Sequence, residues 1–222
     1  LSGCGVGFKF MQAFALSNGL TNHNELESLL DLVAVSIAAD IVPIVDENRI
    51  MAFHGLRRIN SNPNLGLRSI IRICKLTNKE ITISDVIFKI GPRINASGRM
   101  QSGMEAVELL VTRDLHEAYE KGQNIDQYNK DRKELDKRIT DEANALIENN
   151  VNIVQGKKSI VIYNKNWHKG IIGIVASRVT EKYHLPCILF SYPGEHQQEQ
   201  IVISNGCEVY AGIIKLNHHI NG

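Results

Sequence analysis

The amino-acid sequence predicts an α/β protein with three successive parts: a mostly helical part, one long connecting helix, and a smaller part built on a parallel βαβ unit. Three observations predict this fold class. Apolar residues recur at helical spacing in the first half. The segment 112–149 contains no proline and carries an apolar stripe among charged residues. After Gly156, a short β-branched run and a second short apolar run flank a helical segment. We expect the parts to be 1–111, 112–149 and 150–222.

Composition sets few limits on function. The chain has 222 residues, 43% apolar and 22% charged, with a net charge of +1, which is typical of a globular protein with a buried core. A net charge this close to zero neither predicts nor excludes a nucleic-acid partner, because a local basic groove is enough to attract phosphate groups. No run of about 18 apolar residues occurs, so no membrane span is expected. Four cysteines without a CxxC pair favour the cytoplasm over a disulfide framework.

The first part is expected to consist of consecutive helices. Residues 5–20 and 48–60 show apolar residues at helical spacing. Residues 30–45 form a nearly continuous apolar run that is long enough for a buried helix, and an Asn-, Pro- and Gly-rich stretch follows residue 60. Thr82 is expected to cap the helix that follows it. The expected helices are 5–20, 30–45 with a break at Pro43, 48–60 and 67–76.

Two further segments complete the helical region. GPRINASGRM, residues 91–100, is rich in glycine and polar residues, which predicts a loop that opens onto a helix start. From Thr112, which can cap, to Asn149 the pattern predicts one helix, spanning on the order of 50 Å. Its stripe is narrow, with gaps at Gly122 and Asn129. These gaps favour a helix that bridges two domains over a coiled coil.

The second part is expected to begin with a βαβ unit. SIVIYN (159–164) and CILFSY (187–192) are predicted strands, and the helix between them ends before Pro186. The crossover should be right-handed, with parallel strands.

Asp40 is the first candidate for chemistry. It follows Ile, Ala and Ala and precedes Ile and Val, and an ionised carboxylate is costly to bury in such surroundings. It would need a metal, a basic partner or a cap donor. Alternatively, Asp40 ends a buried helix and bonds local backbone groups. We interpret Asp31 as an N-terminal helix residue without a special role.

The segment 91–100 is the second candidate. Arg93 and Arg99 flank Asn95, and guanidinium groups near a helix start can bind phosphate oxygens. A surface turn with solvated arginines is the alternative.

The third candidate is the turn that precedes the last predicted helix. Trp167, His168 and Gly170 lie where a strand leads into a helix, which is the edge where α/β units usually bind ligands. The helix start suits a phosphate, and His168 could donate to it or transfer a proton. Alternatively, His168 caps the helix beside a packing tryptophan.

In order and spacing, these segments resemble the RecJ exonucleases of the DHH/DHHA1 phosphoesterase superfamily. The resemblance covers nearly the whole chain and is strongest in 1–15, 30–60, 91–100 and 166–179. It implies the C-terminal part of a DHH domain, a connecting helix and a partial DHHA1 domain. It also implies 5′-to-3′ hydrolysis of single-stranded DNA with Mn²⁺ or Mg²⁺, in DNA repair and recombination. Protein partners are not indicated.

By position, the resemblance assigns roles to individual residues. It implies that Asp40 is a metal ligand and that Arg93, Asn95 and Arg99 face the DNA backbone. His168 and Lys169 would line the same cleft, with His168 as a catalytic group. Ser204 falls in the family's phosphate-binding stretch. The resemblance implies no role for any other residue.

The sequence also departs from the family's pattern. Asn205 and Gly206 stand where an arginine-serine pair is expected, and neither an Asp-x-Asp nor an Asp-His-His motif occurs. We therefore expect an internal fragment that does not cleave DNA by itself. Two alternatives stay open: a non-catalytic scaffold that binds single strands, and a DHH phosphodiesterase that acts on short oligonucleotides.

Overall fold

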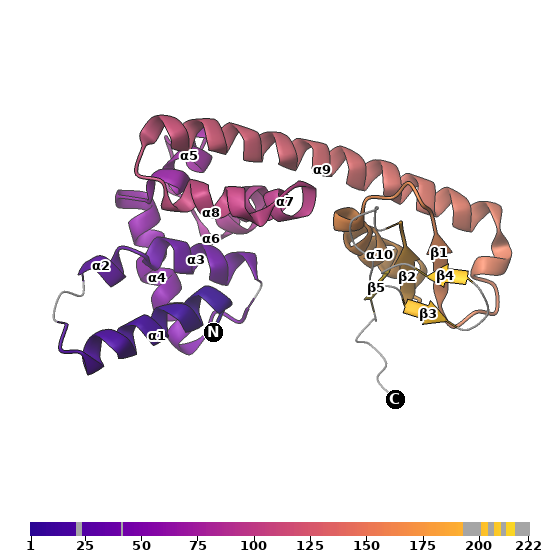
Figure 1. Ribbon diagram of the computed structural model, residues 1–222, viewed down its shortest axis with the longest axis horizontal. Coiled ribbons are helices and arrows are strands. Elements are labelled where there is room, and N and C mark those ends of the chain that lie inside the picture. Colours follow the sequence, from indigo (N-terminus) through magenta and orange to yellow (C-terminus); the bar gives the residue numbers. More distant parts are fainter. Residues whose placement is uncertain (21–23, 41, 193–200, 204–206, 210–211, 216–222) are drawn as a thin grey trace. The chain divides into compact units, whose positions relative to one another are not determined.

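The computed structural model describes residues 1–20, 24–40, 42–192, 201–203, 207–209 and 212–215 (Figure 1). The chain divides into two compact units, Leu1–Asn129 and Lys130–Gly222. Their border falls inside one continuous helix, α9 (Leu115–Asn149). The division at 111/112 and 149/150 therefore stays a prediction.

The described part of the first unit is helical. The helices expected at 5–20, 30–45, 48–60 and 67–76 are confirmed as α1, α3, α4 and α5, with α3 ending ahead of Pro43. The elements are α1 (Gly3–Ser17), α2 (Asn24–Glu27), α3 (Leu30–Ala39), α4 (Asp46–Ser61), α5 (Leu65–Ile73), α6 (Ile83–Asp85), the π-helix η1 (Val86–Ile90), α7 (Gly91–Met100), α8 (Gly103–Val111) and the start of α9.

The prediction of a loop at 91–100 is wrong, because this segment is the helix α7. It continues directly from η1, and Pro92 lies in its first turn. Ala96 and Ser97 are fully buried. The Ser97 hydroxyl donates to the Ser102 carbonyl oxygen at 2.7 Å. Burial of the small residues, which composition does not reveal, stabilises the helix.

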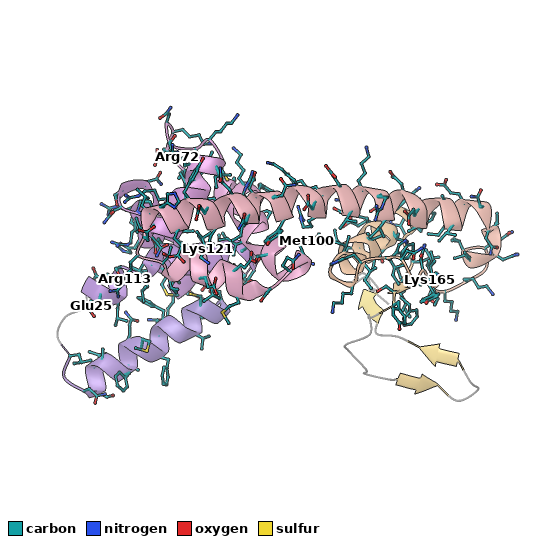
Figure 2. All side chains as sticks on the ribbon, turned by 45° about the horizontal axis from the view of Figure 1, so that its top comes forward. Glu25, Arg72, Met100, Arg113, Lys121 and Lys165 are labelled. Carbon is teal, nitrogen blue, oxygen red and sulfur yellow. The ribbon has the colours of Figure 1, made fainter. Side chains whose placement is uncertain are left out.

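Side-chain caps mark two helix starts. Thr82 caps α6 as predicted, in a reciprocal box with Asp85. The helix α9 is also confirmed, but Asp114 caps it in place of Thr112: its Oδ1 accepts from the Glu117 N–H at 2.7 Å. Lys121 further along α9 pairs with Glu108 of α8, with 2.6 Å between Nζ and Oε2 (Figure 2).

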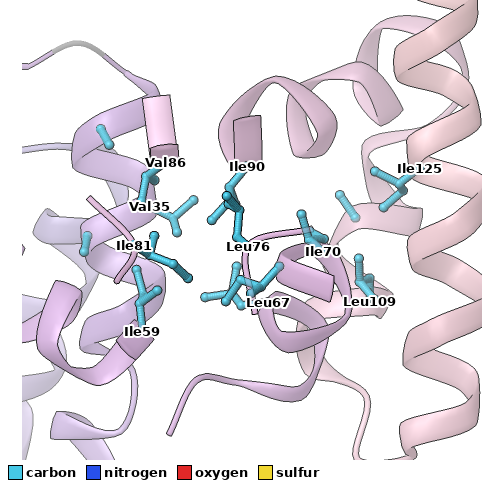
Figure 3. Close-up of a cluster of buried hydrophobic side chains, with 14 of the residues drawn as sticks. Val35, Ile59, Leu67, Ile70, Leu76, Ile81, Val86, Ile90, Leu109 and Ile125 are labelled. Carbon is cyan, nitrogen blue, oxygen red and sulfur yellow. The ribbon is translucent and has the colours of Figure 1, made fainter. Parts of the chain in front are cut away.

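The core of the first unit lies where α3, α4, α5, η1, α8 and α9 meet (Figure 3). Gly122 of α9 is part of this packing. A Cβ atom at Gly122 would lie 2.4 Å from the Ser69 hydroxyl and 2.9 Å from Ile73 Cδ1. Both Gly122 and Asn129 are buried, so the expected gaps in the α9 stripe are contact positions. The largest fully buried side chains of this core are Leu67, Ile70, Ile90, Leu109 and Ile125.

The second unit contains the predicted βαβ unit. After a short 3₁₀ turn, η2 (Val151–Ile153), β1 (Ile160–Tyr163) leads to α10 (Lys169–Tyr183) and then to β2 (Cys187–Phe190). β1 and β2 are parallel, as predicted. β5 (Gly212–Lys215) adds to β2 in the antiparallel sense, and β3 (Ile201–Ile203) pairs with β4 (Cys207–Val209) in a separate ribbon. Ile160, Ile171, Val175 and Leu189 are fully buried.

Candidate nucleic-acid and metal sites

Asp40 is exposed in the structure. It ends α3, where its backbone N–H donates to the Ser36 carbonyl and its Oδ2 accepts from the Ser36 hydroxyl at 3.1 Å. The expectation that Asp40 needs a compensating partner because it is buried is therefore wrong: solvent stabilises its charge. Its role as a metal ligand stays a prediction.

Asp31 is the buried carboxylate of the apolar run, and the sequence interpretation missed it. Its exposed fraction is 0%. Oδ1 accepts from the Leu32 N–H at 2.8 Å, and Oδ2 accepts from the Asn64 N–H at 2.7 Å. Burial raises the pKa of Asp31, while the hydrogen bonds from Asn64 and Leu32 and the charge of Arg58 oppose that rise. Asp31 thus connects α3 to the start of α5, a contact 33 residues along the chain.

The described residues do not fit a divalent metal. Nowhere among the described residues do three or more His, Cys, Asp and Glu side chains gather closely enough to hold an ion. Mg²⁺ and Mn²⁺ take several oxygen ligands, and Asp40 by itself offers one carboxylate.

The three candidates on α7 differ in their surroundings. Arg93 is mostly buried, and its Nε lies 2.8 Å from Asp126 Oδ1 of α9. Its Nη1 donates to the Lys89 carbonyl at 2.7 Å. Asn95 and Arg99, one turn apart, are exposed. Arg93 therefore holds α7 against α9, and Asn95 and Arg99 are the two accessible members of the set.

At the start of α10, His168 is the N-cap residue. Its Nδ1 accepts from the Gly170 N–H at 3.1 Å, so the neutral ring carries its proton on Nε2. Burial, and then the charge of Lys169, lower the pKa of His168. Lys169 is exposed. The capping interpretation of His168 is confirmed, and a cap leaves Nε2 available as a donor.

The strand ends beside this helix start carry further polar groups. Asn164 follows β1, and its N–H donates to the Phe190 carbonyl of β2 at 3.1 Å. Ser191 follows β2 and is 1% exposed, and its hydroxyl has no hydrogen-bond partner among the described residues. Lys165 lies in the turn between β1 and α10 (Figure 2). Only the pairing of β1 with β2 reveals that Ser191 lies at this edge. Ser204 lies outside the described residues.

Curated proteins of known name match the chain strongly. The single-stranded-DNA-specific exonuclease RecJ of Haemophilus influenzae is 35% identical over 204 residues, which cover 88% of this chain and 35% of that protein. RecJ of Bacillus subtilis is 37% identical over 197 residues, which cover 88% of this chain and 24% of that protein. The chain belongs to the RecJ family. It spans about a third of the length of the first of these RecJ relatives.

Solved RecJ structures agree with this RecJ assignment. Exonuclease RecJ bound to manganese superimposes with a TM-score of 0.66 and 31% identity, over 77% of this chain and 43% of that one. RecJ from Thermus thermophilus in complex with Mg²⁺ superimposes with a TM-score of 0.62 and 30% identity, over 76% of this chain and 27% of that one. The expected fold class, helical DHH part, long helix and DHHA1-type βαβ unit, is confirmed. No protein-family profile matches the chain. The described helices include none that is long and apolar enough to cross a membrane.

Proposed function

We propose that this RecJ-family chain is part of a 5′-to-3′ single-stranded-DNA exonuclease that uses Mn²⁺ or Mg²⁺, and that it contributes DNA-binding surface. The observation that carries the proposal is its 32–37% identity with proteins named single-stranded-DNA-specific exonuclease over most of the chain. RecJ structures that contain Mg²⁺ or Mn²⁺ support the choice of metal.

Two surfaces, one in each unit, are proposed to bind phosphate. In the first unit, Asn95 and Arg99 of α7 would donate to phosphate oxygens, with Arg93 fixing α7 through its ion pair. In the second unit, the side chains of His168 and Lys169 at the start of α10 would do the same, because the N–H groups of Gly170 and Ile171 already donate to His168. Phosphate contacts of this kind give affinity without base specificity, as an exonuclease that degrades varied sequences requires. Ser204 is proposed to add a phosphate contact.

Hydrolysis is proposed to need more than this chain. Asp40 would give one ligand to a metal that activates water and stabilises phosphate charge, but the described residues do not complete such a site. Binding of single-stranded DNA without cleavage is therefore the second candidate for the chain alone. The free thiols of Cys4, Cys74 and Cys187 support a cytoplasmic location, and the exonuclease assignment supports a role in DNA repair and recombination.

Salt-dependent binding of a labelled oligothymidine tests the proposal. Arg99→Ala and Lys169→Ala should each weaken binding. Each should also reduce, by roughly one, the steepness with which the logarithm of the binding constant falls with the logarithm of the salt concentration. Arg113→Ala (Figure 2) and Lys133→Ala serve as matched controls, since each removes one positive charge from an exposed position elsewhere. The controls should change the slope little.

Two results would contradict the proposal. Absence of any binding at low salt would remove the DNA-binding role. Robust Mn²⁺-dependent release of nucleotides by the pure chain would show that it holds a complete metal site, contrary to the arrangement of its described carboxylates.

A further inference from the structure

Trp167, the single tryptophan of the chain, is tied to α9. It lies in the turn between β1 and α10, and its exposed fraction is 3%. The indole N–H donates to Oε2 of Glu142 at 2.8 Å. Glu142 belongs to α9, 25 residues earlier, and both residues are in the second unit. A buried indole N–H needs an acceptor, and Glu142 provides it.

The Glu142 carboxylate is itself oriented. Its second oxygen, Oε1, lies 3.7 Å from Nε of Arg138, one turn earlier on α9. Glu142 is half-buried, whereas Arg138 is mostly exposed. One oxygen therefore faces the indole and the other faces a guanidinium group. Because the acceptor is ionised, this hydrogen bond is stronger than one between neutral groups.

The turn around Trp167 is compact, and it leads directly into the helix cap. The Trp167 N–H donates to the Asn164 carbonyl at 3.2 Å, and the Asn166 N–H donates to Asn164 Oδ1 at 3.0 Å. The next residue, His168, caps α10. A large ring that is buried and hydrogen-bonded leaves the following backbone little freedom. The start of α10 is therefore held against α9 through Trp167.

We propose that Glu142 is a positioning residue for DNA binding: by holding Trp167, it fixes the turn that places the side chains of His168 and Lys169 for contact with phosphate. This inference rests on the proposed function, because it assigns a role in that same α10 surface. Glu142 itself touches no DNA in this scheme.

The test compares Glu142→Ala and Glu142→Gln in the whole chain, with Glu148→Ala as the matched control. Glu148 is also on α9, but its partner on α10 is Lys182, with 2.8 Å between Oε1 and Nζ. One readout is the solvent-exchange rate of the single indole N–H resonance. The other is the affinity for a labelled oligothymidine at low salt. Glu142→Ala should speed indole exchange and weaken binding about tenfold, as expected for loss of a charged hydrogen bond.

The remaining variants separate positioning from general destabilisation. Glu142→Gln keeps an acceptor oxygen and should restore most of the affinity and of the exchange protection. Glu148→Ala should change neither readout. Trp167→Phe keeps a ring but removes the donor, so it should weaken binding as Glu142→Ala does. The double variant Glu142→Ala with Trp167→Phe should bind no more weakly than either single variant, because each of the two substitutions removes the same hydrogen bond. If Glu142→Ala does not fold, Trp167→Phe and Glu142→Gln still test the hydrogen bond.

The outcomes distinguish the two proposals. If the unsubstituted chain does not bind DNA, the proposed function fails, and the positioning role fails with it. If Lys169→Ala weakens binding but Glu142→Ala and Trp167→Phe do not, only the positioning role is overturned. Equal losses from Glu142→Ala and Glu148→Ala, or additive losses in the double variant, also overturn it.

Discussion

At the scale of single residues, His168 depends on being neutral. Its Nδ1 can accept from the Gly170 N–H only while that nitrogen has a free lone pair. The pKa of His168 is lowered by burial and by Lys169. A histidine with a lowered folded-state pKa contributes its full stability above the unfolded value of about 6.5. That contribution is lost as the pH falls through the folded-state value.

The first prediction follows from this cap. His168→Ala should lower the free energy of unfolding by about 1 kcal/mol at neutral pH. The cost should shrink as the pH falls below about 6.5, since the protonated ring no longer caps. Urea unfolding followed by the fluorescence of Trp167, measured from about pH 5 to pH 8, checks this. A cost that is constant over that range would show that the imidazole does not cap in solution.

The two aspartates at opposite ends of α3 give the second prediction. Asp31→Ala leaves the N–H groups of Leu32 and Asn64 without their acceptor, and should lower the free energy of unfolding by about 1–3 kcal/mol. Asp40→Ala, the same change at an exposed helix end, should stay within about 0.5 kcal/mol. Denaturant unfolding followed by circular dichroism compares them. Equal effects would contradict the assignment of Asp31 as the structural carboxylate.

At the scale of elements, the contact between α3 and α4 depends on Gly55. A Cβ atom there would lie 2.1 Å from the Leu30 carbonyl oxygen and 2.6 Å from Ala34 Cβ, so a larger residue must push the helices apart. Glycine is otherwise unfavourable in a helix by about 1 kcal/mol relative to alanine. The close approach of the two helices explains why it occurs here.

The third prediction concerns the sign of a Gly-to-Ala change. Gly55→Ala should lower the melting temperature although it raises helix propensity, because overpacking costs about 1–3 kcal/mol. Gly7→Ala in α1 is the matched control: a Cβ atom at Gly7 meets nothing within 4 Å. That variant should be more stable than the parent by up to about 1 kcal/mol. Thermal unfolding of both should therefore give shifts of opposite sign.

At the scale of the whole molecule, each unit buries apolar side chains, yet α1 leaves some of its own exposed to water. On α1, Phe10 is 69% exposed and Leu16 is 70% exposed, and Phe14 is also exposed. Clustered exposed apolar residues are unusual on a monomeric globular protein. The buried face of the same helix packs Phe8 against α3 and α4.

The fourth prediction is that this α1 surface binds a hydrophobic dye. The native chain should enhance the fluorescence of anilinonaphthalene sulfonate, since such dyes report accessible apolar surface. Phe10→Ser with Phe14→Ser should reduce the enhancement severalfold. Phe88→Ser removes an equally exposed ring of η1 and should reduce it much less. An unchanged signal in the α1 double variant would place the dye elsewhere.

Much of the fold is predictable from the chain because it depends on neighbours in sequence. Helical periodicity and a continuous apolar run located α1, α3, α4, α5 and α9, and two short apolar runs located β1 and β2. The prediction of a loop at 91–100 failed because its small residues are typical of loops when only the local sequence is considered. They form α7 where Ala96 and Ser97 become buried against other helices.

The sequence by itself determined the family and the order of the elements, and it predicts the residues of α7 and of the start of α10 that are proposed to meet phosphate. Only the tertiary structure decided which polar groups are buried. It buried Asp31 and exposed Asp40, paired Arg93 with Asp126, and gave Trp167 its acceptor in Glu142. The physical reason is that burial and hydrogen bonding depend on partners 25 to 33 residues away, and no local pattern records such distances.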